Sequence, residues 1–333
     1  MSTAAVSVMN KNEPRRGSGP DFSIAARESA IDRIFQGATM FFALLVLAIL
    51  GGVIVSLIVG SLPILQTAGL SFLYTEVWNP VTDEYGALAP IYGTLVTSAI
   101  AMVIGVPLSF GIAVFITELC PARLKRPLST AIELLAGIPS IIYGIWGLFV
   151  LAPILQQSVQ PFLIATLGNL PGIGHLFAGP PYGIGVFTAG VILAVMVLPF
   201  ISSVMRDVFE TVPPILKESA YGLGATTWEV VSKVVLPYCR VGVVGGIMLG
   251  LGRALGETMA VTFVIGNAHR ISASLLAPGT TISATIANEF TEAVGDLYTS
   301  ALITLGLLLF AITLVVLTIA RLMLARLAMA EGK

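Results

Sequence analysis

The sequence predicts an all-α integral membrane protein with six transmembrane helices, and three observations support this fold class. Of the 333 residues, 56% are hydrophobic and only 11% are charged, whereas soluble domains carry roughly 25% charged residues. Six runs of sequence are long and apolar enough to cross a bilayer. The basic residues concentrate in alternate loops between these runs. This composition argues against a soluble enzyme, a nucleic-acid-binding protein and a disordered regulator.

Each predicted span meets the length of about 20 apolar residues that a helix needs to cross the bilayer core. Helices, rather than a barrel, satisfy the backbone of such runs in lipid. Prolines lie inside the second, third and fourth runs, which predicts a bundle whose neighbouring helices satisfy the freed carbonyls. The first run is too long, and starts too late, for a cleavable signal peptide. The six runs cover residues 39–62, 91–116, 128–155, 183–205, 242–266 and 300–322.

The basic residues predict the orientation of these spans. Fifteen of the 17 lysines and arginines lie in the N-terminal segment, in the loops after spans two and four, or in the C-terminal segment. The remaining loops hold only Arg270, and Arg253 lies inside span five. Because basic residues concentrate on the cytoplasmic side of a membrane protein, both termini are expected to be cytoplasmic.

Three parts of the chain follow from this topology. Residues 1–37 are predicted to form a cytoplasmic tail, ending in an amphipathic stretch that lies along the membrane interface or leads into the first span. Residues 38–62 form the first transmembrane helix. Residues 91–326 form a core with the five remaining spans and a long cytoplasmic loop at 206–241.

The chain's own motifs indicate neither a metal site nor an ATP site. His175 and His269 are single and far apart in sequence, which disfavours metal binding. Cys120 and Cys239 fall near the cytoplasmic edge and are expected to be reduced. The sequence has no Gly-x4-Gly-Lys-Ser/Thr motif, so any energy from ATP must come through another subunit.

The cytoplasmic loop 206–241 is patterned as two short helices. Proline at 213 and 214 and glycine at 222 and 224 suit the start and the end of the first helix. Thr226, followed three residues later by Glu229, predicts a capping box at the start of the second. Such a loop either offers a protrusion to a groove of another protein or packs only on its own bundle.

The same loop carries the residues of a family resemblance. The pattern Glu218-x-Ala220-x3-Gly224, with Leu236-Pro237 after it, resembles the "EAA" loop of ABC importer permeases, with Ser219 in place of the second alanine. The resemblance runs from about residue 30 to the C-terminus, and four further stretches are similar to the phosphate-specific branch of the family. These stretches read IYGTLVTS (91–98), ELLAGIPS (133–140), VMRDVF (204–209) and GLGRALGETMA (250–260).

The resemblance implies a type I ABC importer permease fold, in the inner membrane of a bacterium. It implies a homologous permease partner (PstA-like), an ATPase dimer that binds ATP and Mg (PstB-like) and an external phosphate-binding protein (PstS-like), with lipid around the spans. It implies no cofactor in this chain, no catalytic site and no nucleic acid. The ATPase-coupling residues that it implies are Glu218, Ser219, Ala220, Leu223 and Gly224.

Two other functions stay open beside this one. The same architecture could serve another oxyanion, such as phosphonate, sulfate or molybdate. The chain could also be a membrane scaffold or sensor subunit that does not transport. An intramembrane enzyme is disfavoured, because no Gly-x-Gly-Asp pair or His-Glu-x-x-His motif is present.

Span five carries two charges that the sequence places at mid-membrane. Arg253 lies about 16 Å into the span, where a lone arginine costs at least about 2.5 kcal/mol. Glu257 follows four residues later and, on a continuous helix, lies on the same face and neutralises it. Gly242, Gly246 and Gly250 share that face and predict close approach of another helix. Either the pair fixes helix register, or it lines and gates the passage and Arg253 attracts phosphate oxygens.

Three residues of span three are further candidates for the passage or its gate. Glu133 is expected within the first third of the span. There its side chain either reaches the cytoplasmic interface, caps a neighbouring helix or takes part in gating the passage. Pro139 and Ser140 are expected to bend the span, and the bend either opens a carbonyl to the passage or is only a kink.

The loops predicted to lie outside are acidic. This charge would repel free phosphate, which favours delivery by a docked binding protein over direct capture. The alternative is ordinary solvated loops. The acidic residues are Glu76, Asp83, Glu84, Glu289, Glu292 and Asp296.

Overall fold

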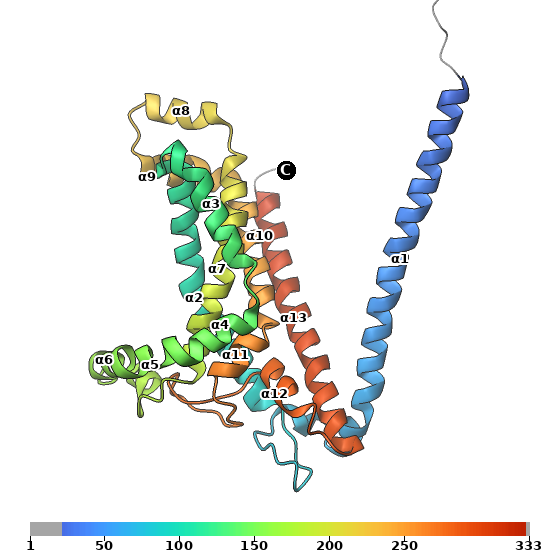
Figure 1. Cartoon of the computed structure of the whole chain (residues 1–333), viewed down its shortest axis with the longest axis vertical. Coiled ribbons are helices and arrows are strands. Elements are labelled where there is room, and N and C mark those ends of the chain that lie inside the picture. Colours follow the sequence, from blue (N-terminus) through green and yellow to red (C-terminus); the bar gives the residue numbers. More distant parts are fainter. Residues whose placement is uncertain (1–21, 331–333) are drawn as a thin grey trace, which may run out of the picture. The chain divides into compact units, whose positions relative to one another are not determined.

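The computed structural model describes residues 22–330, and within that range the regular structure is helical (Figure 1). The chain divides after Ser56 into two units. The first unit is described as the initial part of α1 (Phe22–Thr67), whose side chains from Asp32 to Ser56 are almost all exposed in this chain. Such a continuously apolar, unburied helix is what a membrane span presents to lipid or to a partner. Of the predicted tail, residues 1–37, the first 21 lie outside the described residues, and residues 22–37 are the first part of α1.

The number of predicted spans is confirmed. Among the described residues, six helical segments are long and apolar enough to cross a membrane. The first, second, fourth and sixth coincide broadly with the runs expected from the sequence. The six segments are Asp32–Thr67, Leu88–Leu119, Ser140–Leu167, Val186–Glu210, Thr227–Leu255 and Asp296–Met323.

The predicted third span, 128–155, is wrong as a single helix. The chain forms α3 (Ala122–Ala136), breaks at residues 137–139 and starts again at α4 (Ser140–Trp146). Pro139 causes the break, because proline disfavours helical geometry in the residue before it and suits the start of a new helix. From α4 the helix continues through η3 (Gly147–Leu151), α5 (Ala152–Ile154), η4 (Leu155–Val159) and α6 (Gln160–Leu167).

The predicted fifth span, 242–266, begins too late and ends too late. The helix runs from α9 (Thr227–Val230) through η6 (Val231–Val235) and α10 (Leu236–Leu255), and it ends at Leu255. Gly256 closes α10, and α11 (Met259–Val264) starts after Thr258. The glycine lacks a side chain to stabilise the helix at this point, and apolar composition alone could not reveal the break.

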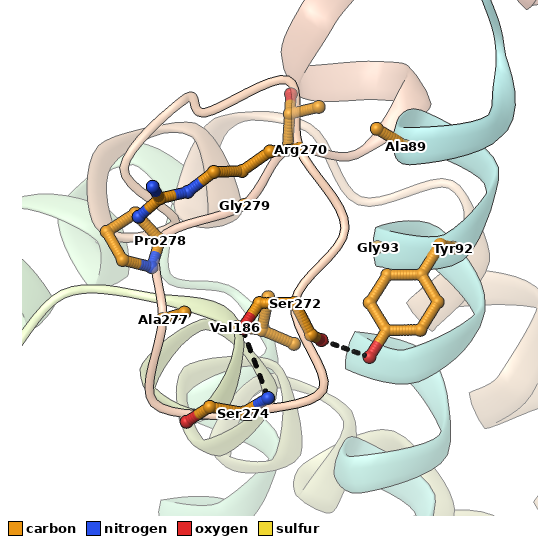
Figure 2. Close-up of a pocket in the computed structure, with 11 residues that line it drawn as sticks. Ala89, Tyr92, Gly93, Val186, Arg270, Ser272, Ser274, Ala277, Pro278 and Gly279 are labelled. Carbon is orange, nitrogen blue, oxygen red and sulfur yellow. Dashed lines mark hydrogen bonds between the residues drawn. The ribbon is translucent and has the colours of Figure 1, made fainter. Parts of the chain in front are cut away.

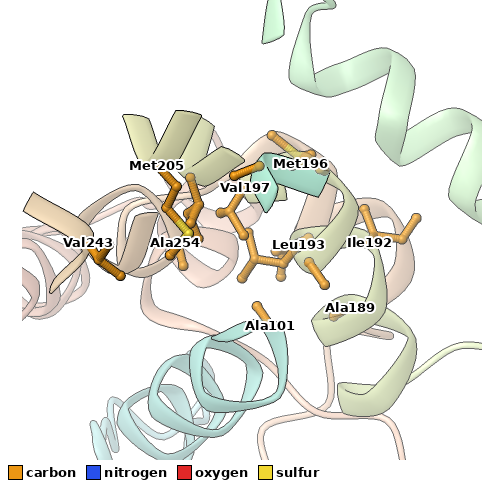
Figure 3. Packing of buried hydrophobic residues seen from close by; sticks show 14 of the residues in the cluster. Ala101, Ala189, Ile192, Leu193, Met196, Val197, Met205, Val243 and Ala254 are labelled. Carbon is orange, nitrogen blue, oxygen red and sulfur yellow. The ribbon is translucent and has the colours of Figure 1, made fainter. Parts of the chain in front are cut away.

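The core is built on α2 (Leu88–Val114) and α7 (Val186–Glu210), which pack along their length. α2 continues into the π-helical turn η2 (Phe115–Leu119). Ala101, Ala189 and Leu193 are among the fully buried side chains between them (Figure 3). Small residues permit this approach. A Cβ on Gly190 of α7, for example, would lie 2.6 Å from the Ile100 side chain of α2.

The predicted glycine face of span five is confirmed. A Cβ added to Gly242, Gly246 or Gly250 would meet the side chains of α7 at 2.5–3.0 Å. The facing residues on α7 are Val208, Val204 and Ile201 respectively. The glycines therefore bring α10 against the same helix that α2 covers, so that α7 lies at the centre of the bundle.

A second core lies at the other end of the bundle from α8 (Pro214–Gly222), around α12 (Ile282–Glu289) and the start of α13 (Asp296–Ala330) (Figure 1). It buries Phe72 of η1 (Gly69–Leu73) and Leu302 of α13. The backbone N–H of Ile64 donates a 3.1 Å hydrogen bond to Ser300 Oγ, which ties the end of α1 to α13. A short turn, η5 (Gly174–Phe177), lies in the loop before α7.

Candidate functional site

The two short helices predicted for loop 206–241 are present as α8 and α9. We call residues 211–235 the α8–α9 loop; Figure 1 shows it at one end of the bundle, with α8 set off from the longer helices. The predicted capping box is confirmed. The N–H of Glu229 donates to Thr226 Oγ1 at 3.3 Å, and the N–H of Thr226 donates to Glu229 Oε2 at 3.0 Å. Gly224 joins the helices with φ +86°, which glycine adopts without strain.

The α8–α9 loop presents apolar side chains to its surroundings. Leu223 is 91% exposed, Ile215 is 69% exposed and Trp228 is 65% exposed. Glu218 and Ser219 are also exposed, whereas Ala220 turns inward and packs against the main core. A groove of about 350 Å³ lies between the two helices. Exposed apolar side chains that gather on one loop, with polar residues around them, are typical of a protein contact surface.

Arg253 lies near the end of α10, beside an aromatic ring. Its guanidinium carbon is 4.1 Å from the centroid of the Phe200 ring on α7, which is a cation–π contact. Its Nε is buried and finds no hydrogen-bond partner in the part of the chain that the structure describes. The cation within this span is therefore held against an aromatic face and keeps N–H groups for another acceptor.

The predicted pairing of Arg253 with Glu257 is wrong. The helix ends at Leu255, so the two residues do not lie on one continuous helical face. Among the described residues, no ion pair joins them. Glu257 Oε1 instead accepts a long, 3.5 Å hydrogen bond from the N–H of Ala260, in the first turn of α11. A carboxylate at a helix start is favoured by the helix dipole, which gives Glu257 a local structural partner.

Glu133 lies outside the third span, contrary to expectation, and has a definite partner. It is on α3, and its Oε1 lies 2.7 Å from Arg206 Nη1 of α7. Arg206 also binds its neighbour Asp207 at 2.7 Å. The Glu133 side chain is half exposed, so this ion pair joins α3 to α7 near the surface of the chain.

Pro139 bends the chain as predicted. It stands directly before α4, and its carbonyl accepts a 3.0 Å hydrogen bond from the N–H of Ile142. Ser140 is the first residue of α4. Among the described residues, no hydrogen bond or ion pair joins Arg253, Glu257 and Glu133 to one another.

Sequence reasoning missed a buried ion pair beneath α8. Lys217 Nζ lies 2.5 Å from Glu118 Oε1 of η2, and the two side chains are 18% and 6% exposed. Lys217 Nζ also donates to the carbonyl of Phe209, near the end of α7, at 3.4 Å. The residues are 99 positions apart, and each reads as an ordinary charge at a membrane edge, so no pattern in the sequence pairs them.

Sequence reasoning also missed a partly buried carboxylate at the end of α12. Glu289 was expected among freely solvated or repelling acids. Instead its Oε2 accepts hydrogen bonds from Trp78 Nε1, at 2.6 Å, and from the Tyr298 hydroxyl, and its Oε1 lies 3.0 Å from His269 Nε2. The Trp78 indole stacks on the His269 ring at 5.2 Å. The Glu289 carboxylate of α12 therefore joins the loop that holds Trp78, the loop that holds His269 and the start of α13.

The hydrogen bonds at Glu289 decide its protonation. Burial acts to raise the pKa of this carboxyl, but the hydrogen bonds from His269, Tyr298 and Trp78 outweigh burial and hold the pKa below its ordinary value. Beside it, burial and the hydrogen bond to Asp83 raise the pKa of Tyr85 to about 12. Glu289 is therefore ionised at neutral pH, and Tyr85 is neutral.

The loop between α11 and α12 closes over the start of α2 (Figure 2). The Tyr92 hydroxyl donates a 2.9 Å hydrogen bond to the carbonyl of Ser272, and a small cavity remains under the loop. Arg270 projects from this loop toward Pro278 and away from Tyr92 (Figure 2). Glu76 accepts a 2.6 Å hydrogen bond from the N–H of Ile271. Thus at least two of the acids expected in solvated loops bind the protein itself.

The fold and the α8–α9 loop define a multi-pass α-helical membrane protein with exposed apolar side chains at one end of its bundle. Residues 105–329 match the family of binding-protein-dependent transport system inner membrane components, and this chain belongs to that family.

Curated relatives agree with this assignment. The phosphate transport system permease protein PstC of Mesorhizobium japonicum is 67% identical over 280 residues, covering 84% of this chain and 86% of the relative. The PstC of Pasteurella multocida is 60% identical over 276 residues, covering 83% and 86%. The probable PstC of Methanocaldococcus jannaschii is 41% identical over 252 residues, covering 74% and 78%.

Solved structures show the same fold. A bacterial alginate ABC transporter in complex with an alginate-bound periplasmic protein matches with a TM-score of 0.56 and 18% identity, covering 88% of this chain and 96% of that chain. A second alginate ABC transporter structure matches with a TM-score of 0.52 and 18% identity, covering 92% and 98%. The fold expected from the resemblance, that of an ABC importer permease, is confirmed.

Proposed function

We propose that this chain is the permease subunit of an ATP-driven phosphate importer. In this proposal the chain forms half of a passage with a second, homologous permease. A separate ATPase dimer binds and hydrolyses ATP and Mg, and an external binding protein delivers phosphate. The high identity to PstC proteins supports phosphate over phosphonate, sulfate or molybdate as the substrate.

The observation that carries the proposal is the exposed apolar surface of the α8–α9 loop. Leu223 is 91% exposed, and together with Ile215 and Trp228 it leaves a large apolar area of this loop in contact with water. Burial against a partner removes that apolar area from water. The Glu218-x-Ala220-x3-Gly224 pattern lies on this surface, which supports docking of the ATPase here.

The orientation follows from the same assignment. If the ATPase docks on the α8–α9 loop, that end of the bundle is cytoplasmic and both termini are on the cytoplasmic side of the inner membrane. The Glu289 cluster and the α11–α12 loop then lie on the outer side, where the binding protein docks. The distribution of lysine and arginine supports this direction.

Arg253 is proposed to line the passage. Among the described residues its buried Nε has no acceptor, and guanidinium N–H groups form strong, geometrically matched hydrogen bonds with phosphate oxygens. The contact with Phe200 positions the cation without neutralising it. Glu133 is proposed to act at the gate through Arg206, and the bend at Pro139 and Ser140 lets α3 and α4 move separately.

The decisive experiment is ATP-dependent uptake of labelled phosphate into vesicles that hold all subunits. Uptake should require ATP, the ATPase and the binding protein, and arsenate should compete while sulfate should not. Preferential uptake of sulfate, molybdate or phosphonate would assign the chain to another oxyanion. An assembled complex that moves none of these anions would leave a scaffold or sensor role.

A further inference from the structure

α8 rests lightly on the bundle. None of its side chains is fully buried, and its main packing partners are α9 and η6, which belong to the same loop. Of the apolar side chains of α8, Ala220 alone packs against the main core, and it is only partly buried. A helix that receives force from a partner must pass it to the membrane helices through some stiffer contact.

Lys217 supplies such a contact. Its ammonium group reaches from α8 to the Glu118 carboxylate at 2.5 Å and to the Phe209 carbonyl at 3.4 Å. Both acceptors lie where α2 and α7 end, and a cation is favoured at a helix C-terminus. The Phe209 ring packs edge-on against Phe110 of α2, with 5.9 Å between centroids. The ammonium therefore meets α7 at the point where α7 and α2 are in contact.

Burial distinguishes this ion pair from the others nearby. The Glu118 side chain is 6% exposed and the Lys217 side chain 18%. Lys125–Glu210 is 37% and 46% exposed, and Lys233–Glu229 is 73% and 41% exposed. An exposed ion pair contributes little to stability, so removing one of its partners has a small effect. Removing one partner of a buried ion pair leaves the other charge uncompensated and has a large effect.

We propose that Lys217 and Glu118 form the strut that transmits movement of α8 to the α2–α7 pair during transport. Both are positioning residues: they touch neither ATP nor the transported anion. The inference rests on the proposed function, in which the ATPase docks on α8. When the ATPase displaces α8, the buried pair moves the ends of α2 and α7 with it.

The test uses the complete complex in vesicles, with labelled phosphate uptake and ADP release measured together. Glu118→Gln and Lys217→Met should still assemble and hydrolyse ATP, but phosphate moved per ATP should fall about five-fold or more. Lys217→Arg should keep the wild-type ratio. The double variant should be no worse than either single variant, because two residues that act as one unit are not additive.

The matched control comes from the exposed pair Lys125–Glu210. Lys125→Met should leave the ratio of phosphate to ATP unchanged. If Glu118→Gln and Lys217→Met lost uptake and ATP hydrolysis in the same proportion, the proposed strut would be wrong. If Lys217→Arg and Glu118→Asp failed to assemble, the pair would serve folding rather than transmission, which would also overturn the proposal. Absence of uptake in the wild-type complex would instead remove the proposed function.

Discussion

Trp78 Nε1 donates a 2.6 Å hydrogen bond to the carboxylate of Glu289, which lies 211 residues further along the chain. The bond joins the loop after α1 to the end of α12. Because Tyr298 and His269 bind the same carboxylate, one ionised group organises a whole end of the bundle.

Glu289→Gln should therefore destabilise this end at neutral pH. The loss is expected to be about 2 kcal/mol, since hydrogen bonds to charged groups contribute about 1.5–3 kcal/mol. The lowered pKa of Glu289 means that its stabilisation is present at neutral pH and is lost as the pH falls below about 4.5. Thermal unfolding of the purified protein, in detergent, should show the gap between wild type and variant closing on acidification. Glu292→Gln, at an exposed acid nearby, is the control, and an equal effect there would contradict the role of Glu289.

Gly93→Ala should destabilise the protein by about 1–3 kcal/mol or prevent its accumulation, because overpacking costs this much in a well-packed interior. A Cβ at Gly93 would lie 1.8 Å from the carbonyl oxygen of Thr280, in backbone that cannot simply rotate away. Gly111→Ala, in the same helix, has open space around its Cβ and should be neutral or stabilising. The measurement is the thermal midpoint of both variants. Equal midpoints would mean that α2 and the α11–α12 loop are less closely packed than described.

Leu223→Asp should weaken binding of the ATPase without unfolding the permease. The side chain is 91% exposed in this chain, so the change removes no internal packing, but it places a charge in an apolar contact. Loss of a central apolar contact is expected to cost about 2 kcal/mol of binding free energy. Co-purification and surface binding of the ATPase measure it. Val81→Asp, exposed to 92% at the opposite end of the bundle, should leave binding intact.

Thr226→Ala should loosen α9 by about 1 kcal/mol, the usual contribution of an N-cap hydroxyl. The expected consequence is faster amide hydrogen exchange in residues 226–235 and weaker ATPase binding. Thr227→Ala is the matched control, since that residue lies inside the helix and does not cap it. Unchanged exchange in Thr226→Ala would show that packing against the bundle, rather than the cap, holds α9.

Arg253→Gln should reduce phosphate uptake about ten-fold or more, in line with about 1.5–3 kcal/mol for a hydrogen bond to a charged group. Assembly with the ATPase should survive, because the contact that is lost inside the chain is one cation–π contact with Phe200. Phe200→Leu removes the aromatic ring but keeps an apolar side chain and the Arg253 cation, and it should have the smaller effect on uptake. Full transport by Arg253→Gln would exclude Arg253 from the passage.

Local features of the fold could be predicted from the sequence. The capping box at Thr226 and Glu229, the glycine face of α10 and the bend at Pro139 each depend on residues within about one or two turns of each other. Their physical causes are local hydrogen bonds, the size of a glycine and the geometry of proline. The apolar runs predicted six spans because the length and the apolar composition of a segment are enough to indicate that it can cross the bilayer as a helix.

The errors in the prediction have a different cause. Apolar composition does not record where a helix breaks, so the ends of the third and fifth spans were misplaced and Arg253 was paired with Glu257. The pairs that matter at the site join residues far apart in sequence, such as Lys217 with Glu118 and Trp78 with Glu289. Each of these residues is unremarkable in its own segment.

By itself, the sequence determined the class of membrane protein, the number of spans and the two short helices of loop 206–241, because hydropathy, charge asymmetry and short-range spacing are properties of the chain. The tertiary structure alone decided which charged side chains are paired within the chain, such as Lys217 with Glu118, and which keep hydrogen-bonding groups for another molecule, such as Arg253. That outcome depends on burial and on partners from other helices, and both exist only once α2, α7, α10 and α13 have packed together.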